Sequence, residues 1–190
     1  MRIPQTLMVA GMLVIASIAG AQTVRARGAD RSLAAAQEQL AARFRPLILH
    51  AVAPAATRED RVALVRFLRS EVLPYIVSEG EVVYPLVDSI AGSAGYATVG
   101  AVLDHDAIGR FVDELDAQAA SANATGFVYP AYALAGVLDT YFAKDQLLVQ
   151  PILENRLSAS DMQALVARMQ AQRVAHASAR DAGAQAPTGN

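Results

Sequence analysis

The sequence predicts an all-α protein, folded as an up-down-up-down four-helix bundle with a short fifth helix at the carboxyl end. Three observations favour this class. Apolar residues recur with helical spacing almost everywhere after Ala29, no stretch alternates with the period of two that marks a strand, and hydrophobic residues make up 54% of the chain. Four long helical patterns with short connections make the bundle the simplest architecture.

The amino-terminal segment is expected to be a targeting signal that is separate from the fold. Arg2 precedes a continuous apolar run, LMVAGMLVIASIA, and Ala19-Gly20-Ala21 fits the small-x-small pattern of a signal-peptide cleavage site. The run is shorter than the roughly 20 apolar residues that span a bilayer. We therefore expect residues 1–21 to be removed on export to the periplasm or the extracellular space. A retained membrane anchor is the first alternative, and a buried helix of the domain is the second.

The first two helices are marked by apolar stripes and by proline. The first is expected over Asp30–Val52, with Pro54 closing it and Pro46 kinking or breaking it. Its inner stripe would be Leu33, Leu40, Phe44, Leu47 and His50. The segment Thr57-Arg58-Glu59-Asp60 is a capping box that opens a second helix running to about Ile90, bent at Pro74 and Pro85.

Breaks and caps divide the rest of the chain. After the Gly92–Gly95 break, a third helix is expected from about Ala97 to Ala120, followed by a loop over residues 121–129. A fourth helix should then run from Pro130 to about Asn155. A second capping box, Ser158–Asp161, starts a fifth helix. The expected organisation is a bundle over residues 30–156, the fifth helix over 157–177 and a disordered tail over 178–190.

Composition excludes several classes of function. The net charge is −2 and there is no basic cluster, so nucleic acid is not an expected partner. The chain has no cysteine, which excludes iron–sulfur clusters, thiolate zinc sites and cysteine nucleophiles. There is neither a glycine-rich phosphate loop nor a serine–histidine–acid arrangement, and no catalytic residue is predicted.

A tyrosine and a carboxylate occur twice at the same spacing. The stretches YIVSEGEVVYP and YFAKDQLLVQP each hold a tyrosine, an acid four residues on and a proline six beyond that. The acids fall in the predicted apolar stripes Leu68, Val72, Tyr75, Glu79, Val82, Leu86 and Leu134, Leu138, Tyr141, Asp145, Leu148, Ile152. Burying a carboxylate costs several kcal/mol unless a partner offsets it. Arg43, beside the first inner stripe, is one candidate partner.

Two histidines supply the other candidate partners. His50 follows the inner stripe of the first helix, and His105 lies with Val102, Ile108, Val112 and Leu115 on an apolar face of the third. A single histidine on such a face is usually a core residue. Two histidines, alternating along the chain with two buried acids, point to a metal site formed by two similar helical hairpins.

This arrangement resembles the haemerythrin, or HHE cation-binding, family over about Leu40–Met169. His50, Glu79, His105 and Asp145 match family ligand positions, Tyr84-Pro85-Leu86 resembles the proline context of the second helix, and Arg156-Leu157-Ser158 resembles the end of the domain. Tyr75 and Tyr141 stand where the family has histidine. Both replacements are the same and are symmetric, which favours tyrosinate ligands over a decayed site, since phenolate is a hard donor suited to ferric iron.

The resemblance implies two non-haem irons with an oxo or hydroxo bridge. The implied ligands are His50, Tyr75, Glu79, His105, Tyr141 and Asp145, with both acids as bridges and room left for dioxygen, peroxide or nitric oxide. The implied role is that of a metal-binding protein that handles or senses such a ligand, and peroxide-directed redox activity stays open. The alternatives are a metal-free structural or interaction bundle and a haem-binding bundle.

Overall fold

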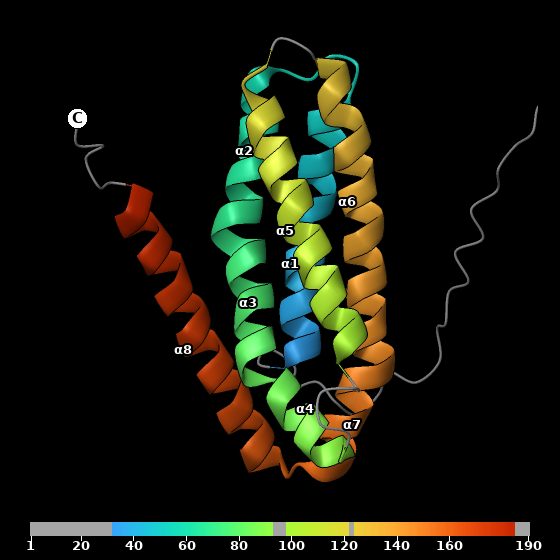
Figure 1. Ribbon diagram of the computed structural model, residues 1–190, viewed down its shortest axis with the longest axis vertical. Coiled ribbons are helices and arrows are strands. Elements are labelled where there is room, and N and C mark those ends of the chain that lie inside the picture. Colours follow the sequence, from blue (N-terminus) through green and yellow to red (C-terminus); the bar gives the residue numbers. More distant parts are fainter. Residues whose placement is uncertain (1–31, 93–97, 122–123, 185–190) are drawn as a thin grey trace, which may run out of the picture.

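The protein is all-helical over the residues that its computed structural model describes, which are 32–92, 98–121 and 124–184. The elements are α1 (Leu33–Val52), α2 (Arg58–Phe67), η2 (Leu68–Val72), α3 (Leu73–Val82), α4 (Tyr84–Ala91), α5 (Val99–Ala119), α6 (Ala124–Lys144), η3 (Asp145–Val149), α7 (Gln150–Arg156) and α8 (Ala159–Ala184). Figure 1 shows α1, α2–α3, α5 and α6 side by side along the long axis, with α4 and α7 at one end. The predicted all-α class is confirmed.

Helix α1 buries a different face near its end from the one that the sequence suggested. Ser32 caps the helix by accepting a hydrogen bond from the Ala35 amide, and the helix continues through Pro46 without a break. The buried positions are Leu33, Gln37, Leu40, Phe44, Ile48 and Ala51. Leu47 is half-buried and His50 is exposed, so the prediction that His50 lies inside is wrong. At 3.6 residues per turn, two successive steps of three rotate His50 by about 120° away from Phe44.

The second long helix contains a π-helical turn. Thr57 and Asp60 form the predicted capping box of α2. In η2 the Leu73 amide bonds the Leu68 carbonyl, five residues back, and Pro74 follows directly. The same arrangement recurs in η3, where the Gln150 amide bonds the Asp145 carbonyl and Pro151 follows. Each wider turn precedes a residue that has no N–H of its own, so the helix continues through both prolines.

Widened or broken turns shift the buried face by one residue. Beyond Asp145 the buried residues are Val149 and Leu153, whereas the predicted Leu148 is 58% exposed. The inserted residue of a π turn explains this shift. In the second helix Val83 and Val87 are buried in place of the predicted Val82 and Leu86, which are half-buried. That shift occurs at Val83, between α3 and α4, where Pro85 provides no N–H for the Glu81 carbonyl.

Two other boundaries and the inner face of α5 were predicted with mixed success. Gly92 ends α4 in the left-handed region, with φ of 66°, as the predicted break requires. The predicted loop over 121–129 is wrong from Ala124 onward, because α6 begins there and buries Phe127 completely. In α5, Val102 is 48% exposed, although Ile108, Val112 and Leu115 are buried as expected.

Helix α8 packs along α3, and its carboxyl end points away from the other helices (Figure 1). Leu165, Val166 and Met169 are its buried residues. It continues to Ala184, past the predicted end, because alanine and arginine favour helix. The rest of the predicted tail, 185–190, lies outside the described residues.

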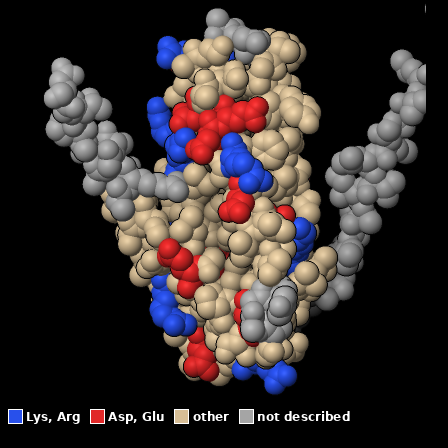
Figure 2. Space-filling view, viewed as in Figure 1, with Lys and Arg blue, Asp and Glu red and all other residues tan. Residues whose placement is uncertain are grey.

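The predicted signal peptide also lies outside the described residues. Within the part of the chain that the structure describes, none of the helices combines the length and the apolar character needed to cross a membrane. On the face shown in Figure 2, uncharged residues cover most of the surface and Lys and Arg side chains lie in separate small groups.

Candidate functional site

The helices bring a group of polar side chains together inside the apolar core. We call this group the buried cluster. It consists of Gln37 from α1, Tyr75 and Glu79 from α3, Tyr84 from α4, His105 from α5, Tyr141 from α6, Asp145 from η3 and Gln150 from α7. Tyr75, Glu79, Tyr141, Asp145 and Gln37 are each at most 1% exposed. Five of the six predicted site residues, all except His50, therefore belong to this cluster.

Glu79 is the acceptor for both predicted tyrosines. The Tyr75 hydroxyl donates to Glu79 Oε1 at 3.3 Å, as the spacing of four residues along one helix allows. The Tyr141 hydroxyl crosses from α6 and donates to Glu79 Oε2 in a short hydrogen bond. The two tyrosines thus converge on one carboxyl group and do not form two separate pairs.

Asp145 has a different set of partners, which sequence reasoning did not predict. Gln37 Nε2 donates to Asp145 Oδ2 at 2.7 Å, and Gln150 Nε2 donates to Gln37 Oε1 at 3.2 Å. The second bond sets the orientation of the Gln37 amide, so its NH₂ group must face Asp145. The Tyr84 hydroxyl is 3.5 Å from Asp145 Oδ1.

The two carboxyl groups share a site with little water. Burial raises the pKa of the Asp145 carboxyl to about 6, against hydrogen bonds that favour its ionised form. Burial, followed by the Asp145 charge and a hydrogen bond to Asp145, raises the pKa of Glu79 well above its ordinary value. At neutral pH the pair therefore consists of a neutral Glu79 beside an ionised Asp145.

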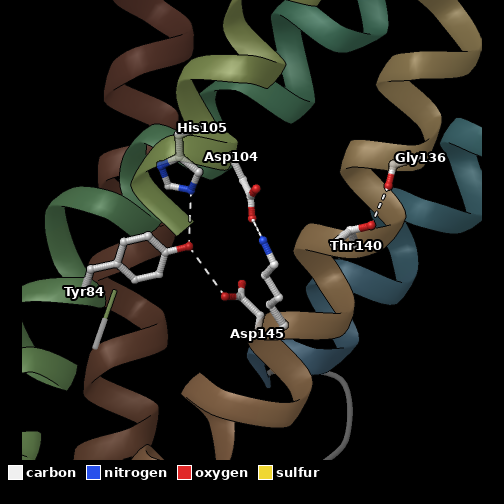
Figure 3. Close-up of polar contacts among 7 residues, drawn as sticks. Tyr84, Asp104, His105, Gly136, Thr140 and Asp145 are labelled. Atoms are coloured by element: carbon white, nitrogen blue, oxygen red, sulfur yellow. Dashed lines mark hydrogen bonds and ion pairs between the residues drawn. The ribbon is translucent and has the colours of Figure 1, made fainter. Parts of the chain in front are cut away.

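His105 connects the pair to the more exposed side of the cluster. Its Nε2 atom lies 3.2 Å from the Tyr84 hydroxyl, and the two rings stack with centroids 5.2 Å apart (Figure 3). Gly80 packs against the same imidazole, and a Cβ atom there would lie 3.4 Å from the ring. Burial lowers the pKa of His105 to about 4, outweighing the nearby charges of Asp104 and Asp106. Its neutral ring nitrogen is available as a ligand or acceptor.

Two phenols of the cluster, Tyr75 and Tyr84, are neutral in the protein alone. Burial, and then the charges of Glu79 and Asp145, raise the pKa of both Tyr75 and Tyr84. A phenolate would therefore form here only if a bound cation displaced the proton.

His50 lies apart from the buried cluster. It is exposed in the last turn of α1, near Asp60 in the capping box of α2. Hydrogen bonds with Thr57 lower the pKa of the Asp60 carboxyl most, and the charge of His50 lowers it further. Tyr84 belongs to the cluster instead. Besides the two glutamine amides, the cluster therefore has six side chains with oxygen or nitrogen donors suited to a metal.

In the sequence, Tyr84 was noted only as the neighbour of Pro85. Gln37 could have been found, because it lies four residues after Leu33 and three before Leu40 on the buried face.

Arginine does not neutralise the buried acids. Arg43 forms a salt bridge with Glu71 at 3.2 Å and lies over the Phe67 ring, with its Cζ atom 4.9 Å from the ring centroid. Lys144 contacts Asp104 at 2.7 Å. The salt bridges found among the described residues include neither Glu79 nor Asp145.

The donor set limits the kind of metal that the cluster suits. Among the described residues there is no group of three or more His, Asp, Glu or Cys side chains arranged to hold a metal ion. The donors that the cluster offers beside its two carboxyl groups and His105 are the tyrosine oxygens and two glutamine amides. Phenolate and carboxylate are hard anionic ligands, which suit ferric iron better than softer metals.

No protein-family model matches this chain, no curated protein does, and no solved structure does. The cluster must be interpreted from its own chemistry.

Proposed function

We propose that this chain is an exported, haemerythrin-like protein that binds non-haem iron in the buried cluster of an up-down-up-down four-helix bundle. Its role would be to handle or sense a small ligand such as dioxygen, peroxide or nitric oxide. The proposal needs no nucleic-acid or membrane partner for the mature protein.

One observation carries the proposal: two carboxyl groups meet in the core, and neither forms a salt bridge with a basic side chain among the described residues. Glu79 and Asp145 come from segments 66 positions apart in the sequence, and each is 1% exposed. Burying even one carboxylate costs several kcal/mol. A multivalent cation would offset that cost for both, which gives a physical reason to keep two acids at one point of an otherwise apolar core.

The donor chemistry fits iron, and especially ferric iron. The residues that would hold the iron are Glu79, Asp145, Tyr75, Tyr84, Tyr141 and His105. Gln37 would orient Asp145 through the same hydrogen bond that it makes in the protein alone. Bound iron would supply one-electron redox chemistry and a Lewis-acidic position for a small ligand.

Proton release is a direct consequence of this ligand set. Glu79, Tyr75 and Tyr84 hold protons in the metal-free protein because burial raises the pKa of each of these groups. Iron binding must displace these protons, so affinity should increase with pH. Ligation by phenolate would also stabilise the ferric state, which favours peroxide chemistry or redox sensing over reversible carriage of dioxygen.

The test is metal analysis of purified protein before and after anaerobic loading with Fe(II) and oxidation. We expect about two irons per chain, no porphyrin absorption and a broad visible band from phenolate-to-iron charge transfer. Tyr141→Phe should weaken the band, because Tyr141 is fully buried against Glu79. Tyr129→Phe is the matched control, since Tyr129 lies on the same helix and is 79% exposed.

Each outcome has a defined meaning. Iron without a visible band would remove the tyrosine ligands but retain an iron site. A band that Tyr141→Phe leaves unchanged would place the iron elsewhere. A Soret band would instead indicate haem. Protein that takes up no iron under these conditions would refute the proposal.

A metal-free structural bundle is the second candidate, and one observation favours it. The buried side-chain polar atoms without a hydrogen-bond partner, among the described residues, are Arg61 Nε and Asp88 Oδ1, and neither belongs to the cluster. The cluster is thus satisfied by the protein alone, and it could serve to fix the register of the helices. In that case the protein would take up no iron, and Glu79→Leu would lower the melting temperature of the metal-free protein, because the Tyr75 and Tyr141 hydroxyls would lose their acceptor.

A further inference from the structure

A cavity adjoins the buried cluster on the side covered by α8. It has a volume of about 80 Å³ and lies between the first turns of α1, the first turn of α3 and the middle of α8. Its walls include Ser32, Ala36, Tyr75, Val166, Met169 and Arg173. A cavity of this size can hold several water molecules or one small polyatomic ligand. It is too small for a cofactor or a peptide.

Tyr75 lies between the cavity and the buried cluster. Its side chain lines the cavity, is 1% exposed and donates to Glu79 at 3.3 Å. Glu79, Asp145 and Tyr141 are themselves fully enclosed. A ligand in the cavity would therefore be separated from Glu79 by one side chain.

The polar groups of the cavity favour an anion. Arg173 is the charged residue among those that line it, and the amides of Gln39 and Gln170 and the hydroxyl of Ser32 provide further donors. Arg173 binds Glu71, which also binds Arg43. Two guanidinium groups thus share one carboxylate, which leaves one net positive charge beside the cavity.

We propose that this cavity binds a small anion of three or four heavy atoms and admits it to the buried cluster past Tyr75. Arg173 selects the charge, and Val166 and Met169 set the size. Binding in the cavity does not require iron. Admission to the cluster rests on the proposed iron centre, whose positive charge would offset the two carboxylates.

The first experiment measures binding in the metal-free protein. Nitrite is titrated into chelator-treated protein with a ¹³C-labelled Met169 methyl group, and the methyl resonance is followed by NMR. We expect a saturable shift with nitrite and none with formamide, a neutral molecule of similar size. Arg173→Gln should weaken binding about ten-fold or more, because a hydrogen bond to a charged group is lost. Arg168→Gln, exposed on the same helix, should leave it unchanged.

A second pair of variants separates the cavity from the docking of α8. Ala36→Leu fills the cavity and keeps Arg173, whereas Ala171→Leu makes the same change on the exposed face of α8. Nitrite binding should disappear in Ala36→Leu alone. Absence of a saturable shift in wild type, or equal shifts in both members of either pair, would overturn the proposal.

The last experiment addresses admission to the cluster. In iron-loaded protein, Ala36→Leu should slow the spectral response to nitrite, while Ala171→Leu should not and both should contain as much iron as wild type. An equal rate in both variants would overturn the access route even if the cavity binds nitrite. Failure to load iron would refute the proposed function and leave the NMR result to decide on the cavity.

Discussion

Replacing Asp145 should change how the stability of the metal-free protein depends on pH. The pKa of Asp145 is about 6 in the folded protein, against an ordinary value of 3.8, because the group is buried. Between these two pH values the folded protein holds a proton that the unfolded chain has released. The free energy of unfolding therefore falls as pH rises from about 4 to about 6.

The size of this effect follows from the shift in pKa. At about 1.4 kcal/mol per pH unit, the change from 3.8 to about 6 corresponds to ~3 kcal/mol. In Asp145→Asn this loss of stability disappears. The pKa of Glu79 also falls in this variant, because Glu79 no longer faces the Asp145 charge, and this changes the pH dependence of stability in the same direction. The stability of Asp145→Asn relative to wild type should therefore increase by about 3 kcal/mol between pH 4 and pH 7.

His105 provides a control of opposite sign. Burial lowers its pKa from 6.5 to about 4, so between these values the unfolded chain binds the extra proton and stability rises with pH. The stability of His105→Gln relative to wild type should fall by ~3 kcal/mol over that range. Asp139→Asn, at a side chain that is 64% exposed, should follow the wild-type profile.

The assay is urea unfolding of chelator-treated protein, followed by circular dichroism at several pH values from 4 to 7. Hydrogen bonds that a substitution removes at every pH shift the whole stability profile by a constant amount, so they do not affect the difference in slope between variants. Profiles of wild type and Asp145→Asn that stay parallel within about 1 kcal/mol would refute the argument that burial perturbs this carboxyl.

Four other predictions concern single positions. Glu79→Ala should release iron and lower the melting temperature of the loaded protein, as metal analysis and thermal unfolding would show; a variant that retains iron would remove Glu79 as a bridge. Gln37→Leu should destabilise the metal-free protein by about 1–3 kcal/mol, because Asp145 and Gln150 lose a buried partner; an unchanged urea midpoint would contradict this. His50→Ala should leave iron content unchanged and stability within about 0.5 kcal/mol, because the side chain is exposed; loss of iron would return His50 to the site. Sequencing of exported protein should find Gln22 as the first residue, whereas Met1 would indicate a retained anchor.

Local pattern predicted much of the buried cluster correctly. Tyr75 and Glu79, and likewise Tyr141 and Asp145, recur at a spacing that places each pair on one helix face, and all four are buried. His105 could be placed from Ile108, Val112 and Leu115 on the same face. These inferences needed only the helical period and the apolar neighbours of each residue.

Errors arose where the helical period changes or where two stripes compete. Leu148 and Val149 are adjacent and apolar, and only the π turn at η3 decides that Val149 is the buried one. Two apolar stripes compete in α1, one that ends in Leu47 and His50 and one that ends in Ile48 and Ala51. Packing against neighbouring helices selects the second, since it stays on one side of the helix.

The sequence by itself determined that this chain is helical, that it begins and breaks its helices at Thr57, Gly92 and Ser158, and that acids and phenols lie on its inner faces. These properties depend on residues close together along the chain. Only the tertiary structure decided that Tyr141 binds Glu79, that Gln37 holds Asp145 and that Tyr84 takes the place expected for His50. Such pairings depend on the rotation and height of one helix against another, and packing of the whole core sets both.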